Sequence, residues 1–197
     1  MQPRQAEVTM SMKNDFIAPI VILTLICLVI SGSLAYVDTF TRPKIEADAA
    51  MRARQEMEKI IPEARDFIEV TNLANIPGTV SGIFAGKDGN GKIAGYIFMV
   101  ASSGYGGKIN IICGIDNNGK ILRTSVMSHT ETKGISDPVF AAPVSGQQTY
   151  QGQYIGKDKN LDGVVAVSGA TVSSTAYKRG IEGALSAFDI VTKGEKQ

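Results

Sequence analysis

The sequence has few of the residues that ligate metals and little excess charge. It contains no tryptophan, one histidine and two cysteines in 197 residues, and its formal net charge is +1. Zinc, haem and iron–sulfur sites rely on cysteine and histidine ligands, so we do not expect this chain alone to form one. The near-neutral charge gives no electrostatic basis for binding nucleic acid. Cys27 lies in an apolar segment and Cys113 in a predicted strand, and we expect no disulfide between them.

A long run without charged residues follows a short polar tail. The tail covers residues 1–15, and the run covers residues 16–37, enough to cross about 30 Å of hydrocarbon as a transmembrane helix. A cleaved signal peptide is the alternative, because Ser33-Leu34-Ala35 resembles a cleavage site. However, the tail is nearly neutral, and the run exceeds a signal-peptide core of about 7–15 residues. A retained membrane anchor is the preferred interpretation.

The charges around this run leave its orientation open. More basic residues follow it than precede it, and the positive-inside rule would then place the large domain in the cytoplasm. That rule loses force for long translocated domains. The residues concerned are Arg4 and Lys13 before the run and Arg42, Lys44, Arg52 and Arg54 after it.

The rest of the chain predicts an α+β domain. Residues 38–62 are rich in helix-forming residues and end at Pro62, which indicates a connector helix packed on its own domain. Residues 63–197 form the predicted folded domain, an antiparallel sheet with flanking helices. Its predicted strands are residues 80–85, 92–101, 108–115 and 120–128.

Three Asp- and Asn-containing segments of this domain resemble calcium loops. The segments beginning at Asp88 and Asp116 each lie between two predicted strands, so we interpret both as hairpin turns. Asp158-Lys159-Asn160-Leu161-Asp162-Gly163 matches the first half of an EF-hand loop, but its twelfth position is Gly169 where a glutamate is needed. We therefore assign no metal site.

The run Ser168-Gly169-Ala170-Thr171-Val172-Ser173-Ser174 lies between two apolar segments. Residues 164–167 predict a short buried strand, and apolar residues recur at helical spacing from Ala176 to Val191. At a strand-to-helix turn, small residues let a ligand approach the backbone, and free N–H groups favour an anion such as phosphate. A Ser/Thr helix cap without a ligand is the alternative, and the run alone does not decide between them.

A second polar segment, Ser128-His129-Thr130-Glu131-Thr132-Lys133-Gly134, contains the single histidine. A histidine beside a glutamate suits acid–base chemistry. The sequence shows no nucleophile in a recognisable elbow, so a hydrogen-bonded loop histidine is preferred and no catalytic residue is assigned.

Three motifs together carry a family resemblance. They are Ser103-Gly104-Tyr105-Gly106-Gly107, His129-Thr130-Glu131-Thr132-Lys133-Gly134 and Ser168-Gly169-Ala170-Thr171-Val172-Ser173, in this order after an N-terminal anchor. The chain thereby resembles the FMN-binding G subunit of the Rnf electron-transport complex. The C subunit of the sodium-pumping NADH:quinone oxidoreductase shares that domain.

The resemblance implies covalent FMN at Ser173. The family joins FMN through a phosphoester to the last hydroxyl residue of S/T-G-A-T-x-T/S, using a separate flavin transferase and FAD. Threonine is usual there, so serine is a departure, and Thr171 and Ser174 are the other candidate acceptors. The resemblance also implies cofactor-binding roles for further residues, namely Ser168, Gly169, Ala170, Tyr105, Gly106, His129, Glu131 and Thr132.

The second motif departs from the family's usual H-x-E-T-P-G-L-G. This chain has Lys133, Ile135 and Ser136 in place of Pro, Leu and Gly. A loop that covers the cofactor is still implied.

The implied function is that of a membrane-anchored flavoprotein subunit. Such a subunit relays electrons within an ion-translocating ferredoxin:NAD oxidoreductase, a translocase that also contains a second flavin subunit and iron–sulfur subunits. The family implies a single-pass protein of the inner (plasma) membrane with the FMN domain on the extracytoplasmic side. The C subunit of the sodium-pumping complex, a non-redox binding module and a hydrolase using His129 and a serine are the alternatives.

Overall fold

The computed structural model describes the backbone of residues 5–71, 73–141 and 149–194. The chain divides into two compact units, Met1–Met51 and Arg52–Gln197. Helix α1 (Gln5–Ile60) begins in the first unit and ends in the second, so it includes both the predicted transmembrane helix and the predicted connector. It starts inside the predicted tail, of which residues 1–4 lie outside the described residues.

Within the first unit, α1 carries the long uncharged run. Its apolar side chains from Ile17 onward are exposed, and the helix is long and apolar enough to cross a membrane. Thr24 and Ser33 donate hydroxyl hydrogen bonds to carbonyl oxygens one turn earlier, each at 2.8 Å. Such bonds satisfy polar groups that hydrocarbon would leave without partners. The prediction of a long apolar N-terminal helix is confirmed.

The second unit is built on a five-stranded antiparallel sheet in which strands follow one another in chain order. Four of the five strands were predicted within two residues of their observed ends. The exception is β1, which pairs with β2 at one edge of the sheet. The strands are β1 (Asp66–Glu69), β2 (Val80–Lys87), β3 (Ile93–Ser103), β4 (Lys108–Ile115) and β5 (Ile121–His129).

Aspartates hold the two hairpin turns that were predicted. Asp88 Oδ1 accepts hydrogen bonds from the N–H groups of Asn90 and Lys92, at 2.8 and 2.9 Å. Asp116 Oδ1 does the same for Asn118 and Lys120, both at 2.8 Å. Gly91 and Gly119 each adopt a positive φ, which glycine tolerates without steric cost.

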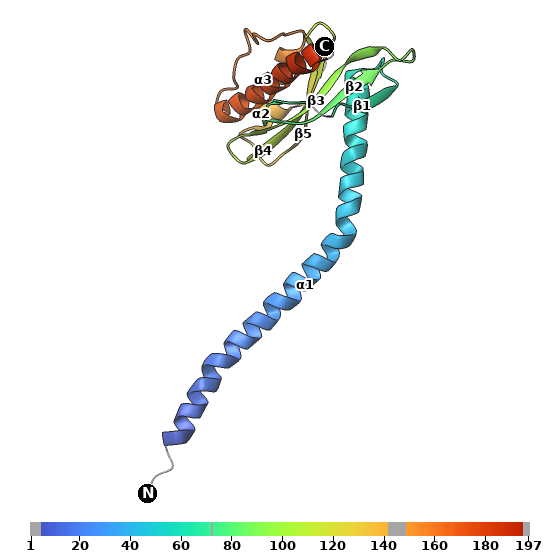
Figure 1. Ribbon diagram of the computed structural model, residues 1–197. Helices are drawn as coiled ribbons and strands as arrows, with labels where there is room; N and C mark the ends of the chain where they lie inside the picture. The colour runs from blue at the N-terminus through green and yellow to red at the C-terminus, as the bar shows by residue number, and fades with distance from the viewer. Residues whose placement is uncertain (1–4, 72, 142–148, 195–197) are drawn as a thin grey trace. The chain divides into compact units, whose positions relative to one another are not determined.

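Helical segments cover both faces of the sheet. Side chains alternate along the strands, so Phe98 of β3 faces the core under α3 (Thr171–Gly194), while Ile97 faces the opposite side. Met57 and Ile60, at the end of α1, are buried on that opposite side. Figure 1 shows α3 lying over its face of the sheet. The helix buries the face that its spacing predicted, with Ala176, Tyr177, Ile181, Ala184, Leu185, Phe188 and Val191.

The segment between β5 and α3 contains two short helices and no strand among its described residues. They are α2 (Asp137–Phe140) and the 3-10 helix η1 (Gln151–Tyr154). The predicted strand at residues 164–167 is wrong, and Val165 is exposed. The Gln153 side chain takes the place of a strand partner, because its amide accepts from Val165 N–H at 2.8 Å and donates to Val165 O at 3.2 Å.

Candidate functional site

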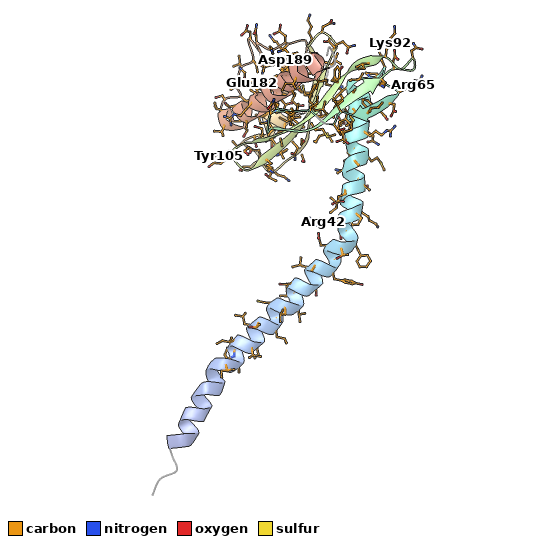
Figure 2. All side chains as sticks on the ribbon, viewed as in Figure 1. Arg42, Arg65, Lys92, Tyr105, Glu182 and Asp189 are labelled. Carbon is orange, nitrogen blue, oxygen red and sulfur yellow. The ribbon has the colours of Figure 1, made fainter. Side chains whose placement is uncertain are left out.

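A glycine turn joins β3 to β4 at one end of the sheet. Gly104 N–H donates to Gly107 O at 2.8 Å and closes the turn. A Cβ atom at Gly104 would collide with the Glu131 carboxyl group, and one at Gly106 would lie 3.0 Å from Glu131 Cα, so the turn lies directly against this residue of the second motif. Tyr105, at the tip, is 75% exposed, and Figure 2 shows it away from the body of the sheet.

Glu131 connects all three motifs. Its Oε1 accepts hydrogen bonds from Gly106 N–H at 2.8 Å and Gly107 N–H at 3.2 Å. Its Oε2 accepts a short hydrogen bond from the Ser173 hydroxyl. Glu131 is 7% exposed and Ser173 is 3% exposed. All three of these partners are donors, as a buried carboxylate requires. The structure thus places motifs that lie far apart in the sequence around one side chain.

Helix α3 begins at this point without a capping side-chain hydrogen bond among the described residues. Ala170 O accepts the first hydrogen bond of the helix, from Ser174 N–H at 2.9 Å. The N–H groups of Thr171, Val172 and Ser173 come before that bond, so the helix itself supplies them with no acceptor. Alanine has no side-chain oxygen to serve them. The alternative of a Ser/Thr cap therefore does not describe this helix start, and three donors without an acceptor among the described residues suit an anion.

The four hydroxyl residues of the run have different environments. Ser174 is fully buried, and its Oγ accepts from Val167 N–H at 3.1 Å, so it fixes the turn before the helix. Ser168 and Thr171 are exposed. Ser173 lies between these extremes, because its hydroxyl is buried but lines a cavity.

That cavity has a volume of about 350 Å³ and lies between the second and third motifs. Ile135 and Val172, each 55% exposed, provide apolar surface at its wall. Among the predicted site residues, the cavity is lined by Tyr105, Glu131, Thr132, Gly169, Ala170, Thr171 and Ser173. Ile135, Ser136 and Val172 complete the lining. Their position next to predicted residues in the sequence was the one signal that could have identified them.

The remaining predicted residues lie outside the cavity lining. Gly106 N–H donates a hydrogen bond to Glu131, and Ser174 Oγ accepts one from Val167 N–H. Ser168 makes no described contact with the cavity. The His129 ring stacks on Phe140 of α2, with ring centroids 4.2 Å apart. No hydrogen bond joins His129 to a serine among the described residues, although the hydrolase alternative requires such a pair.

A buried cluster of three tyrosines, Tyr150, Tyr154 and Tyr177, packs at the start of α3. Tyr150 OH donates to Ser174 O at 2.7 Å, so Tyr154 must donate in the 2.8 Å bond between the two tyrosine hydroxyls. Burial raises the pKa of Tyr154, and its hydrogen bond to Tyr150 raises it further. Burial also raises the pKa of Tyr177, which contacts both rings. The cluster is therefore neutral at physiological pH and has a structural role.

Comparison with known proteins identifies the relatives of this chain. Residues 104–186, which include all of the site, match the FMN-binding domain family. The G subunit of the ion-translocating oxidoreductase complex of Methanosarcina acetivorans is 29% identical over 196 residues, covering 94% of this chain and 100% of the relative. The G subunit of the proton-translocating ferredoxin:NAD(+) oxidoreductase complex of Clostridium ljungdahlii is 26% identical, covering 88% of this chain and 91% of the relative.

A third relative is similar over a shorter region. The G subunit of the ion-translocating oxidoreductase complex of Haemophilus influenzae is 32% identical over 124 residues, 59% of this chain and 58% of the relative. The resemblance predicted from the three motifs is thus confirmed: the chain is similar to G subunits of ion-translocating oxidoreductase complexes, in the first two cases over 88–94% of its length, and its site lies in the part that matches the FMN-binding domain.

Proposed function

We propose that this protein is a membrane-anchored flavoprotein subunit that relays electrons through FMN joined to Ser173 within an ion-translocating oxidoreductase complex. The observation that carries the proposal is the position of Ser173. Its hydroxyl lies at the wall of the cavity and at the start of α3, where Glu131 brings the other two motifs to it. FMN, when bound, supplies one- or two-electron exchange, and the protein supplies position and electrostatics.

The residues present fit FMN. The three N–H groups at the start of α3 suit a phosphate, which is favoured by the partial positive charge of a helix N-terminus. Gly169 has a φ of 79° and open space where a Cβ would stand, so nothing obstructs approach to the backbone. Ile135, Val172 and Tyr105 offer the apolar and aromatic surface that a flat ring system needs.

Ser173 is the preferred acceptor because of its surroundings. Ser174 is buried and engaged with Val167, and Thr171, although exposed at the cavity, has no carboxylate partner among the described hydrogen bonds. An alcohol is too weakly acidic to attack a phosphate unaided, so attachment requires a transferase. The new bond joins Ser173 Oγ to the FMN phosphorus, the FAD pyrophosphate bond breaks, AMP leaves, and the hydroxyl proton is lost.

The partners follow from the relatives' names. Those relatives are subunits of ion-translocating oxidoreductase complexes, so we expect this chain to bind other subunits of such a complex. The family resemblance implies that these include iron–sulfur subunits and a second flavin subunit. The membrane-crossing run has no charged side chain to carry ions, so ion transport belongs to other subunits. We place the FMN domain on the extracytoplasmic side, where a covalent bond prevents loss of the cofactor by dissociation.

Mass spectrometry of the full chain co-expressed with its flavin transferase tests this proposal. We expect an adduct of FMN mass in the wild type and its complete loss in Ser173→Ala. Ser186→Ala is the matched control, because the described hydrogen bond of this exposed serine is to Glu182 O of the same helix, and it should keep the adduct. An adduct that persists in Ser173→Ala places the acceptor elsewhere. A wild type without any adduct refutes covalent attachment.

A further inference from the structure

Glu131 differs from the other residues that line the cavity. It carries a formal charge, whereas the rest of the described lining is uncharged. It also lies deeper than the apolar residues at the wall, at 7% exposure against 55% for Ile135 and Val172. A charge enclosed in this way is poorly screened by water and acts strongly on whatever occupies the same cavity.

The carboxylate is held in place independently of Ser173. Oε1 accepts from two backbone N–H groups of the glycine turn, Gly106 and Gly107. A phosphoester at Ser173 removes the hydroxyl proton that Oε2 accepts, but it leaves both of these bonds intact. Gly104 packs against the same carboxylate, at a distance that leaves no room for a side chain. The two backbone N–H groups therefore still hold the Glu131 carboxyl group at the cavity after attachment.

We propose that Glu131 holds a fixed negative charge beside the flavin attached at Ser173 and thereby lowers its reduction potential. The proposal rests on the proposed function. Reduction adds electrons to the ring system, and a fixed anion in the same cavity opposes added negative charge. The phosphoester carries a negative charge too, but it is common to every flavinylated variant. A change at Glu131 therefore isolates the contribution of the carboxylate.

Potentiometric titration of the flavinylated full chain in detergent, with dithionite as reductant, measures this contribution. Glu131→Gln removes the charge and keeps an oxygen that accepts from Gly106 and Gly107. We expect its midpoint potential to be more positive than that of the wild type. Glu182→Gln is the matched control, because it removes the same charge from an exposed position of α3 about 13 Å along the helix from Ser173.

Figure 2 shows Glu182 partway along α3, away from Tyr105. The control should shift the potential less than Glu131→Gln. Equal potentials in wild type and Glu131→Gln, or equal shifts in the two variants, overturn the proposal for Glu131 while leaving the proposed function intact. A wild-type chain that takes up no flavin instead refutes the proposed function.

A second measurement needs only the wild type, in case Glu131→Gln is not flavinylated. Redox-induced infrared difference spectra are recorded on the flavinylated chain with and without carbon-13 labelling of glutamate. We expect a carboxylate band that shifts on flavin reduction and moves with the label, because one described glutamate lines the cavity. A difference spectrum without any glutamate band overturns the proposal.

Discussion

Ser173 and Ser174 show how helix geometry separates two identical neighbours. Successive residues of an α-helix project about 100° apart, so one faces the cavity and the other faces the core. Ser174 fixes the preceding turn through Val167 N–H, and its carbonyl accepts from Tyr150. Ser173 has Glu131 as its partner instead. Ser174 therefore fixes the backbone next to Ser173, the candidate acceptor, but its own hydroxyl is not available for attachment.

The tyrosine cluster gives a stability prediction at the residue scale. Tyr150→Phe removes the hydrogen bond to Ser174 O and leaves the Tyr154 hydroxyl without its acceptor. We expect a loss of about 1–3 kcal/mol in the free energy of unfolding. The measurement is urea unfolding of the full chain in detergent, followed by near-ultraviolet circular dichroism.

Tyr177→Phe is the control for that substitution. Its hydroxyl is buried near Thr124 and has no hydrogen-bond partner among the described residues. Removing an unsatisfied buried hydroxyl should leave stability unchanged or raise it. An unfolding free energy that falls as much for Tyr177→Phe as for Tyr150→Phe would show that ring packing, and not hydrogen bonding, stabilises the cluster.

At the scale of elements, β4 is confined between α3 and the end of α1. A Cβ atom at Gly114 of β4 would collide with the Ile60 side chain, which is buried on that face of the sheet. We expect Gly114→Ala to lower the free energy of unfolding by about 1–3 kcal/mol, because overpacking forces side chains out of their preferred rotamers. Unfolding in urea measures the change.

Gly78→Ala is the matched control for Gly114→Ala. Gly78 is exposed, has open space where a Cβ would stand and has no positive φ. We expect this variant to unfold at the wild-type urea concentration or slightly above it, because alanine restricts the unfolded chain. Equal stability of the two variants would mean that Ile60 moves aside at little cost.

The sequence predicted the elements whose pattern is local. Strands β2 to β5 alternate between two buried faces and are separated by Asp- and Gly-containing turns, so their pattern is visible in short windows. Strand β1, by contrast, is a four-residue edge strand with mostly exposed side chains and gives no such pattern. Residues 164–167 look like a strand, but the Gln153 side chain bonds both backbone groups of Val165. The N–H groups of Val164 and Val167 donate to Leu161 O and Ser174 Oγ instead of to a neighbouring strand.

At the scale of the whole molecule, the site depends on contacts that no local pattern contains. The three motifs predicted most of the cavity-lining residues because their order matches a family. Spacing could not predict the role of Glu131, which lies 25 residues from Gly106 and 42 from Ser173. His129 is the last residue of β5, and its ring stacks on Phe140 of α2 outside the cavity. Glu131, two residues later in the loop, contacts Ser173 of α3 instead.

The last prediction concerns the intact protein and the side of the membrane on which its folded domain lies. Basic residues near the apolar run favour a cytoplasmic domain, whereas the resemblance favours an extracytoplasmic one, and we predict the latter. Lys92→Cys places a thiol on an exposed turn of the domain (Figure 2). We expect a membrane-impermeant maleimide to label this thiol in spheroplasts.

Two features make that labelling specific. Cys113 is fully buried, and burial raises the pKa of its thiol, so little reactive thiolate forms there. Cys27 lies within the apolar run, beyond the reach of a charged reagent once the helix crosses the membrane. Ser11→Cys, placed before the run, should be labelled only after the membrane is permeabilised. Labelling of Ser11→Cys in sealed spheroplasts with Lys92→Cys unlabelled would place the domain in the cytoplasm, as the charge distribution alone suggests.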